Sequence, residues 1–262
     1  MTDRVFTLTS RASRIWIAVT IVAVWAFPEV RAAEAPTHHW SYSGETGPEH
    51  WASEDPAYAT CGIGKSQSPI DITSVQTRQL PAIEFDYRAT ALHVTDTGHS
   101  MQVNYEPGSA IIIDGERYVL QQFHFHVPSE ERLHGRAYSM TAHLVHRNAQ
   151  GQLAVVAVLL KQGKSNAFLK PIFDNFPMAG TPESSVPGGT LNLADFLPAK
   201  HGYYSYDGSL TTPPCSEHVR WLVLKAPVEI SAAQIQQFAK HYPRNARPVQ
   251  PLNGRVVVAT ED

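Results

Sequence analysis

The sequence has no large excess of charge of either sign and no repeated unit. Of its 262 residues, 17% are charged and the formal net charge is −3, with Lys and Arg spread along the chain. Such a chain has no general affinity for nucleic acid. No heptad or short-period repeat is present, which argues against a coiled coil or a solenoid. The hydrophobic content of 43% is ordinary for a globular protein, and the length is sufficient for one large core.

Long hydrophobic runs are also scarce. The longest, Ile15–Phe27, is about 13 residues, shorter than the roughly 20 that a bilayer crossing needs. Three arginines precede it, and small residues at cleavage-like spacing follow Pro28. This layout predicts a secretory signal peptide over residues 1–32 and a mature domain over 33–262, located in the periplasm or outside the cell. An uncleaved membrane anchor is the alternative; after cleavage no membrane span is expected.

Cysteine is limited to Cys61 and Cys215. Two cysteines without further ligands nearby are a poor zinc signature, because a zinc site needs three or four ligands. In an exported chain a disulfide is favoured over a pair of free thiols.

Helical patterns are few, and short extended runs separated by turn residues dominate. The Asp114–Gly115 pair predicts a hairpin, and Leu153–Leu160 is apolar on both faces, as expected of an interior strand. The run Arg255–Val258 reads as a further strand. Helices are expected only around 165–173 and from a capping box at Ser231 to about His241. The sequence therefore predicts a mainly β single domain with short peripheral helices, built on a large, mostly antiparallel or mixed sheet.

The stretch Gln122–His126 carries the strongest chemical signal. In a β-strand, His124 and His126 share one face with Gln122, while Phe123 and Phe125 point to the other. Two such imidazoles can converge on one zinc ion, although a pair of hydrogen-bonded, half-buried histidines is the simpler alternative. His143, on an extended run 140–145, could supply a third imidazole. Three imidazoles leave a fourth position open, as catalytic zinc sites do, but spacing alone does not decide between these alternatives.

Several motifs in order resemble the α-class carbonic anhydrases. They are His124-Phe125-His126, Pro128-Ser129-Glu130, Ala142–His146 and Gly208–Pro214, with flanking matches at 39–42, 67–70, Trp221 and 247–252. The resemblance covers essentially the whole mature chain. It implies a twisted, largely antiparallel sheet of about ten strands, with zinc at the bottom of a conical cleft. It also implies reversible hydration of CO2 to bicarbonate and a proton, through attack of a zinc-bound hydroxide.

The resemblance also assigns roles to single residues. It implies that His124 and His126 bind Zn²⁺ through Nε2 and His143 through Nδ1. Thr211 would accept a hydrogen bond from the nucleophile and pass its own proton toward Glu130.

Further roles concern the substrate and the proton. Thr212 would contact bicarbonate, and His99 would be the proton shuttle, since an imidazole with a pKa near 6.5 is well matched to a donor near 7. Because CO2 is apolar, a hydrophobic pocket wall is expected. By resemblance, the wall comprises Val145, Val155, Leu210 and Trp221, and the other cleft-lining residues are Tyr42, Gln102 and Gln122.

Cys61 and Cys215 coincide with a disulfide seen in many exported members of this family, which would pin the loop that carries Thr211. Sulfonamides and anions are expected to inhibit, and a homodimer is an option because bacterial relatives are often dimers.

Two positions depart from the family pattern. Thr141 stands where the family usually has a glutamate that accepts the free N–H of the third histidine ligand, and Glu131 stands where many relatives have histidine. Loss of such a carboxylate predicts weaker zinc retention or a changed pKa of the zinc-bound water; the effect of Glu131 is left open. The alternatives to an enzyme are a non-catalytic, carbonic-anhydrase-like binding module and a structural zinc protein. The latter is disfavoured because no fourth protein ligand is apparent.

Overall fold

The computed structural model of the chain describes residues 1–2, 39–177 and 183–261. The predicted signal peptide lies outside the described residues, apart from its first two. Among the helices that are described, none has the length and apolar composition needed to cross a bilayer.

A sheet of 13 strands forms the body of the protein. Its main path runs in the order β12-β4-β5-β7-β10-β11-β14-β13-β16-β2, while β6 pairs with β7, β3 with β6, and β15 with β11. Neighbours are antiparallel except for β11 with β14, β11 with β15, and β16 with β2. The strands are β2 (Gln76–Thr77), β3 (Glu84–Asp86), β4 (Thr90–Asp96), β5 (Met101–Asn104), β6 (Ala110–Ile113), β7 (Glu116–His126), β10 (Met140–Arg147), β11 (Leu153–Gln162), β12 (Ser184–Leu191), β13 (Tyr203–Ser209), β14 (Glu217–Leu224), β15 (Val228–Ile230) and β16 (Val258–Ala259).

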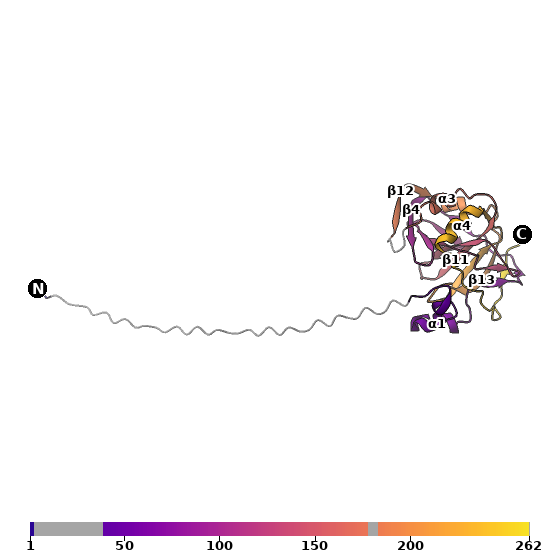
Figure 1. Ribbon diagram of the computed structural model, residues 1–262, viewed down its shortest axis with the longest axis horizontal. Helices are drawn as coiled ribbons and strands as arrows, with labels where there is room; N and C mark the ends of the chain where they lie inside the picture. Colours follow the sequence, from indigo (N-terminus) through magenta and orange to yellow (C-terminus); the bar gives the residue numbers. More distant parts are fainter. Residues whose placement is uncertain (3–38, 178–182, 262) are drawn as a thin grey trace. The chain divides into compact units, whose positions relative to one another are not determined.

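The remaining elements are short. A 3-stranded sheet joins β1 (Asp71–Ile72), β8 (Arg132–Leu133) and β9 (Arg136–Ala137). In Figure 1, α3 and α4 lie together at one end of the body, and the Phe173 and Phe238 rings of these helices are in contact at 5.7 Å. The helices are η1 (Gly44–Thr46), α1 (Trp51–Glu54), η2 (Pro56–Tyr58), α2 (Thr60–Ile63), α3 (Leu169–Phe173), η3 (Leu193–Phe196) and α4 (Ala232–His241).

Hydrophobic cores lie on both faces of the central strands. In β11, Val156 and its alternate neighbours pack into one core, while Val155 and its alternate neighbours pack into a second. In β7, Phe123 and Phe125 are fully buried in the first core, so His124 must point to the opposite face. The strand alternation of the sequence therefore decides which face of the sheet carries the histidines.

The mainly β fold predicted from the sequence is confirmed, as are the interior position of β11, the Asp114–Gly115 hairpin and the capping box at Ser231. The sheet has 13 strands where about ten were expected; ten lie on the main path.

Two predicted elements are shorter than expected. The helix around 165–173 begins at Leu169, whose backbone N–H is bonded to the Asn166 side chain at 3.1 Å. The strand expected at Arg255–Val258 is paired only from Val258, because Arg255 turns back to bond the Leu252 carbonyl.

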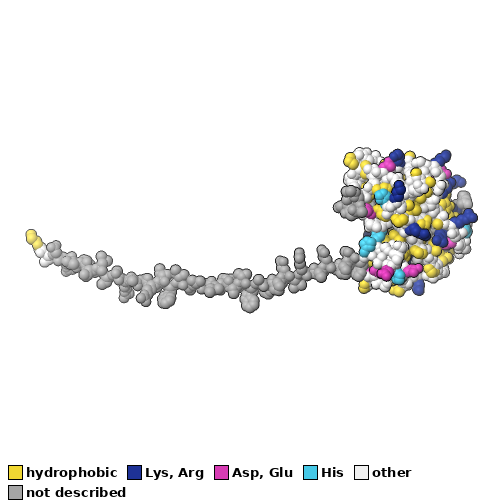
Figure 2. All heavy atoms as spheres, viewed as in Figure 1, with side chains coloured by type: hydrophobic (Ala, Val, Ile, Leu, Met, Phe, Trp, Pro, Cys, Tyr) yellow, Lys and Arg dark blue, Asp and Glu magenta, His cyan; other side chains and the backbone are white. Residues whose placement is uncertain are grey.

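Charged side chains of both signs are scattered among hydrophobic and uncharged ones on the face shown in Figure 2. This distribution fits the low net charge of the sequence, −3.

Candidate metal centre

The register of three adjacent strands brings the predicted histidines together. His143 of β10 is paired with His124 of β7, which is paired on its other side with Gln102 of β5. His126 is paired with Thr141, two residues before His143. One ring nitrogen from each of His124, His126 and His143 lies within 4.8 Å of the others.

Each of these imidazoles is held by an oxygen acceptor. Nδ1 of His124 lies 2.8 Å from the side-chain oxygen of Gln122, and Nδ1 of His126 lies 2.6 Å from the backbone oxygen of Asn245. Nε2 of His143 lies 2.9 Å from Oε1 of Glu131. An acceptor on one nitrogen fixes the tautomer and leaves the lone pair of the other nitrogen for a metal.

The nitrogens left over suit a metal site. Nε2 of His126 is fully buried and has no hydrogen-bond partner among the described residues. A buried polar atom without a partner is costly, and a bound cation would satisfy it. The three-histidine set therefore fits zinc, which prefers imidazole nitrogen and takes an open fourth position in catalytic sites.

Burial keeps two of these rings neutral. It lowers the pKa of His124 to about 3, with a smaller contribution from His143, and it lowers the pKa of His126 well below the ordinary value. Burial also acts to lower the pKa of His143, but the carboxylates of Glu131 and Glu130 outweigh it and raise that pKa. An imidazole must be neutral to donate its lone pair to a metal, so the first two rings are ready to bind at neutral pH.

Glu130 lies beside the histidines and is 1% exposed. Its Oε1 accepts the backbone N–H of Arg247 at 2.7 Å, while Oε2 has no hydrogen-bond partner among the described residues. Burial raises the pKa of Glu130 to about 7, and the Thr211 hydroxyl is near enough to act against this rise.

The loop that carries Thr211 is tied down at several points. The N–H of Leu210 is bonded to the Ser216 carbonyl at 2.9 Å, and the N–H of Cys215 is bonded to the Thr212 carbonyl at 2.8 Å. Cys215 forms a disulfide with Cys61, as the sequence predicted. Thr211 is thereby held in a buried position, 5% exposed.

A cavity of about 180 Å³ opens on the metal site. Five residues predicted to act here line it with two of the histidine ligands: Tyr42, His99, Gln102, Gln122 and Thr212, beside His124 and His126. The other lining residues are Trp40, Thr97 and Ser100.

The predicted apolar wall does not line this cavity. Val155 and Trp221 are buried in the second core, and Val145 and Leu210 pack against it. The ring centroid of Trp221 lies 4.8 Å from that of His143.

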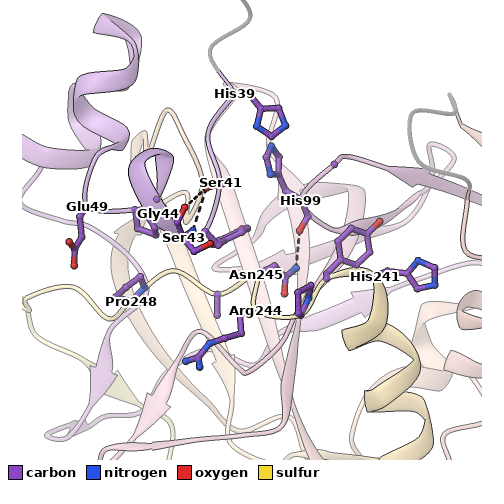
Figure 3. Close-up of a pocket in the computed structure, with 17 residues that line it drawn as sticks. His39, Ser41, Ser43, Gly44, Glu49, His99, His241, Arg244, Asn245 and Pro248 are labelled. Carbon is purple, nitrogen blue, oxygen red and sulfur yellow. Dashed lines mark hydrogen bonds between the residues drawn. The ribbon is translucent and has the colours of Figure 1, made fainter.

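His99 lines the cavity and is stacked on Trp40 at a centroid distance of 3.5 Å. It also borders a larger surface groove of about 710 Å³, where its ring lies beside His39 and its backbone oxygen accepts from Asn245 (Figure 3). Burial and the neighbouring His39 lower the pKa of His99 to about 4. The expected match to a donor near 7 is therefore absent in this side-chain position.

Sequence reasoning missed two partners of the histidines. Asn245 holds His126 from 119 residues away and bonds the backbone of Phe125 and Val127, so no local pattern could identify it.

The second missed partner corrects an expectation. His143 was expected to lack a carboxylate, yet Glu131 supplies one, while the Thr141 hydroxyl is turned to the Val158 carbonyl at 3.4 Å. The sequence did offer one signal. It departs from the family pattern at two positions, Thr141 and Glu131; Thr141 lies two residues before His143, and Glu131 contacts its ring.

Several known proteins similar to this chain are carbonic anhydrases, in agreement with the three-histidine site. The family described as "Eukaryotic-type carbonic anhydrase" matches residues 46–261. A carbonic anhydrase of Neisseria gonorrhoeae is 43% identical over 92% of this chain and 95% of its own length; one from Nostoc sp. is 43% identical over 86% and 88%. The structure of an α-carbonic anhydrase from Thermovibrio ammonificans with the inhibitor sulfanilamide is 42% identical, with a TM-score of 0.81 over 84% of this chain and 99% of its own. The chain therefore belongs to the α-class carbonic anhydrase family.

Proposed function

We propose that His124, His126 and His143 hold a zinc ion and that the reversible hydration of CO2 takes place in the cavity above them. The observation that carries this proposal is the arrangement of the three rings. Each has an oxygen acceptor on one nitrogen, and one nitrogen of each ring lies within 4.8 Å of the others.

The zinc ion, when bound, supplies a hydroxide nucleophile at neutral pH by lowering the pKa of a bound water to about 7, the established property of carbonic anhydrases. Residues of the chain hold the ion and orient the nucleophile. The Thr211 hydroxyl would accept a hydrogen bond from the attacking oxygen and donate a hydrogen bond to Glu130. Oε2 of Glu130 suits this role, because its other oxygen already accepts from Arg247.

Fixed donors and acceptors of this kind aim the nucleophile at carbon without reorganisation during the reaction. A divalent cation on the histidines would favour the ionised form of Glu130, which is the form that accepts from Thr211.

The substrate side of the cleft combines apolar and polar groups. CO2 offers almost no hydrogen-bonding handle, so the apolar side chains of the second core, Val145, Val155, Leu210 and Trp221, would exclude water from its position. Thr212 lines the cavity and would contact bicarbonate.

His99 is placed to carry the product proton from the cleft to the surface groove, because it borders both. To accept that proton readily it must leave the stack on Trp40. A pKa lowered to about 4 disfavours proton transfer from a donor near 7.

Metal binding tests the proposal directly. Metal-free chain should take up one zinc per molecule, measured by titration against a chromophoric chelator, and His126→Ala should lose most of this affinity. Failure of the unaltered chain to bind zinc stoichiometrically would refute the site. A chain that binds zinc but hydrates no CO2 would instead be the non-catalytic binding module.

We also propose that the chain is exported and that sulfonamides inhibit it. The Cys61–Cys215 disulfide supports export, since such bonds persist in oxidising compartments. The sulfanilamide complex of the Thermovibrio ammonificans enzyme supports inhibition of this chain by sulfonamides.

A further inference from the structure

Glu131 is a fully buried carboxylate whose nearest polar partner is a predicted zinc ligand. It is 0% exposed, and its Oε1 lies 2.9 Å from Nε2 of His143. Among the described residues, no lysine or arginine forms an ion pair with Glu131. The one described residue that does so is His143. Burying an unpaired carboxylate costs folding free energy, so the contact with His143 calls for an explanation.

The backbone around Glu131 is held in place independently of His143. The Ser129 hydroxyl donates to the Glu131 carbonyl at 2.8 Å, and the same hydroxyl accepts the N–H of Tyr138 at 2.8 Å. The carboxylate is therefore presented to the ring by a turn that is already fixed. The opposite order, in which the ring alone fixes the turn, does not fit these contacts.

The contact determines which nitrogen of His143 can bind a metal. An ionised carboxylate only accepts hydrogen bonds, so Nε2 carries the proton and the lone pair lies on Nδ1. A carboxylate behind a ligating imidazole also fixes the ring orientation and makes the ring a stronger donor to the metal.

Thr141 occupies the position from which the family usually supplies this carboxylate, and it does not do so here. Its hydroxyl donates to the Val158 carbonyl at 3.4 Å. Thr141 and His143 are two residues apart on β10, so their side chains project from the same face, and both are buried. A glutamate at position 141 could therefore approach the same ring along the strand, whereas Glu131 approaches it from a separate turn.

We propose that Glu131 is the positioning residue of His143, and that this chain has exchanged the usual carboxylate at position 141 for one at position 131. The inference rests on the proposed zinc site. It explains both departures from the family pattern at once, since each change compensates for the other. It also predicts that zinc retention in this chain is not weakened by Thr141.

Zinc affinity of the complete metal-free chain, measured by competition with a chelator, tests the inference without relying on activity. Glu131→Ala should bind zinc 10–100-fold more weakly. Glu131→Gln preserves shape and an acceptor oxygen, so it should fold normally and still lose affinity, by a smaller factor. Thr141→Val is the matched control on the same strand face and should bind zinc as the unaltered chain does.

The decisive variant combines Glu131→His with Thr141→Glu. If the carboxylate has only changed its position, Glu131→His alone should lose zinc affinity and the double variant should regain most of it, a strong non-additivity. Zinc binding of Glu131→Ala and Glu131→Gln equal to that of the unaltered chain would overturn the inference, as would a loss of affinity in Thr141→Val. Failure of the unaltered chain to bind zinc would instead refute the proposed site, so the two failures are distinguishable.

Discussion

At the scale of single residues, the metal centre depends on what stands behind each histidine. The ligand trio could be predicted because the motif His124-Phe125-His126 and His143 occur in the order of a known family. The acceptors behind the rings could not be predicted in the same way. Asn245 reaches its histidine through the tertiary fold, and Glu131 reaches His143 from a turn. Sequence spacing identifies which residues can meet, whereas the direction of each ring is set by contacts that only the fold creates.

His99 provides the first prediction. Among the described residues it is the one imidazole, apart from the ligands, that lines the cavity. His99→Ala should slow CO2 hydration at least about tenfold in weak buffer, because no imidazole then carries the proton outward. Stopped-flow assays should show recovery on adding free imidazole.

The matched control for His99 is His241→Ala. His241 borders the same surface groove but does not line the cavity, so its loss should leave the rate unchanged. Equal rates for His99→Ala and the unaltered chain in weak buffer would show that protons leave by another route.

At the scale of elements, the strands and the Thr211 loop hold the site rigid. The alternation of β7 and β10 was readable from the sequence, because Phe123 and Leu144 mark the core faces of these strands. The starting residue of a predicted element was less readable: α3 and β16 both begin later than expected, where side-chain or turn contacts hold the preceding residues.

The disulfide should stabilise both the fold and the loop. It closes a segment of 154 residues, and in the chain-entropy account this contributes about 4–5 kcal/mol to the free energy of unfolding. The variant Cys61→Ser with Cys215→Ser should unfold at a lower temperature. It should also have a lower kcat/KM, because the Thr211 loop loses one of its ties.

Wild-type protein with verified reduction of both thiols should behave as this variant does. Unchanged melting temperature and activity in both samples would show that the bond contributes nothing to the loop.

His146 on β10 should make stability depend on pH. It is 0% exposed between the Tyr87 hydroxyl at 2.9 Å and the Ala154 carbonyl at 3.3 Å, and burial lowers its pKa to about 3. The unfolded chain, with a pKa near 6.5, binds this proton more readily than the folded chain. Stability is therefore complete above pH 6.5 and falls as the pH drops toward 3, by about 2–3 kcal/mol at pH 4.5.

Urea unfolding of zinc-loaded protein between pH 7.5 and 4.5 measures this slope. His146→Gln should remove the share due to His146, and substitution of the exposed His50 by Gln should not. Parallel curves for His146→Gln and the unaltered chain would contradict the assignment.

At the scale of the whole molecule, the sequence predicted the class of fold but not its extent. The short strand Gln76–Thr77 joins the sheet only through pairing with Val258–Ala259, far away in the sequence, so it carries no pattern of its own. Strand pairing brings His143 beside His124, and the disulfide joins the Thr211 loop to Cys61. The activity is thus a property of the assembled sheet.

Stopped-flow measurement of CO2 hydration by the chain, with its zinc content quantified, tests whether this site is a carbonic anhydrase. We predict a kcat/KM of about 10⁴ M⁻¹s⁻¹ or more, lost on removal of zinc, restored by one equivalent of zinc, and suppressed by sulfanilamide. Hydration at the uncatalysed rate by a fully zinc-loaded chain would contradict it.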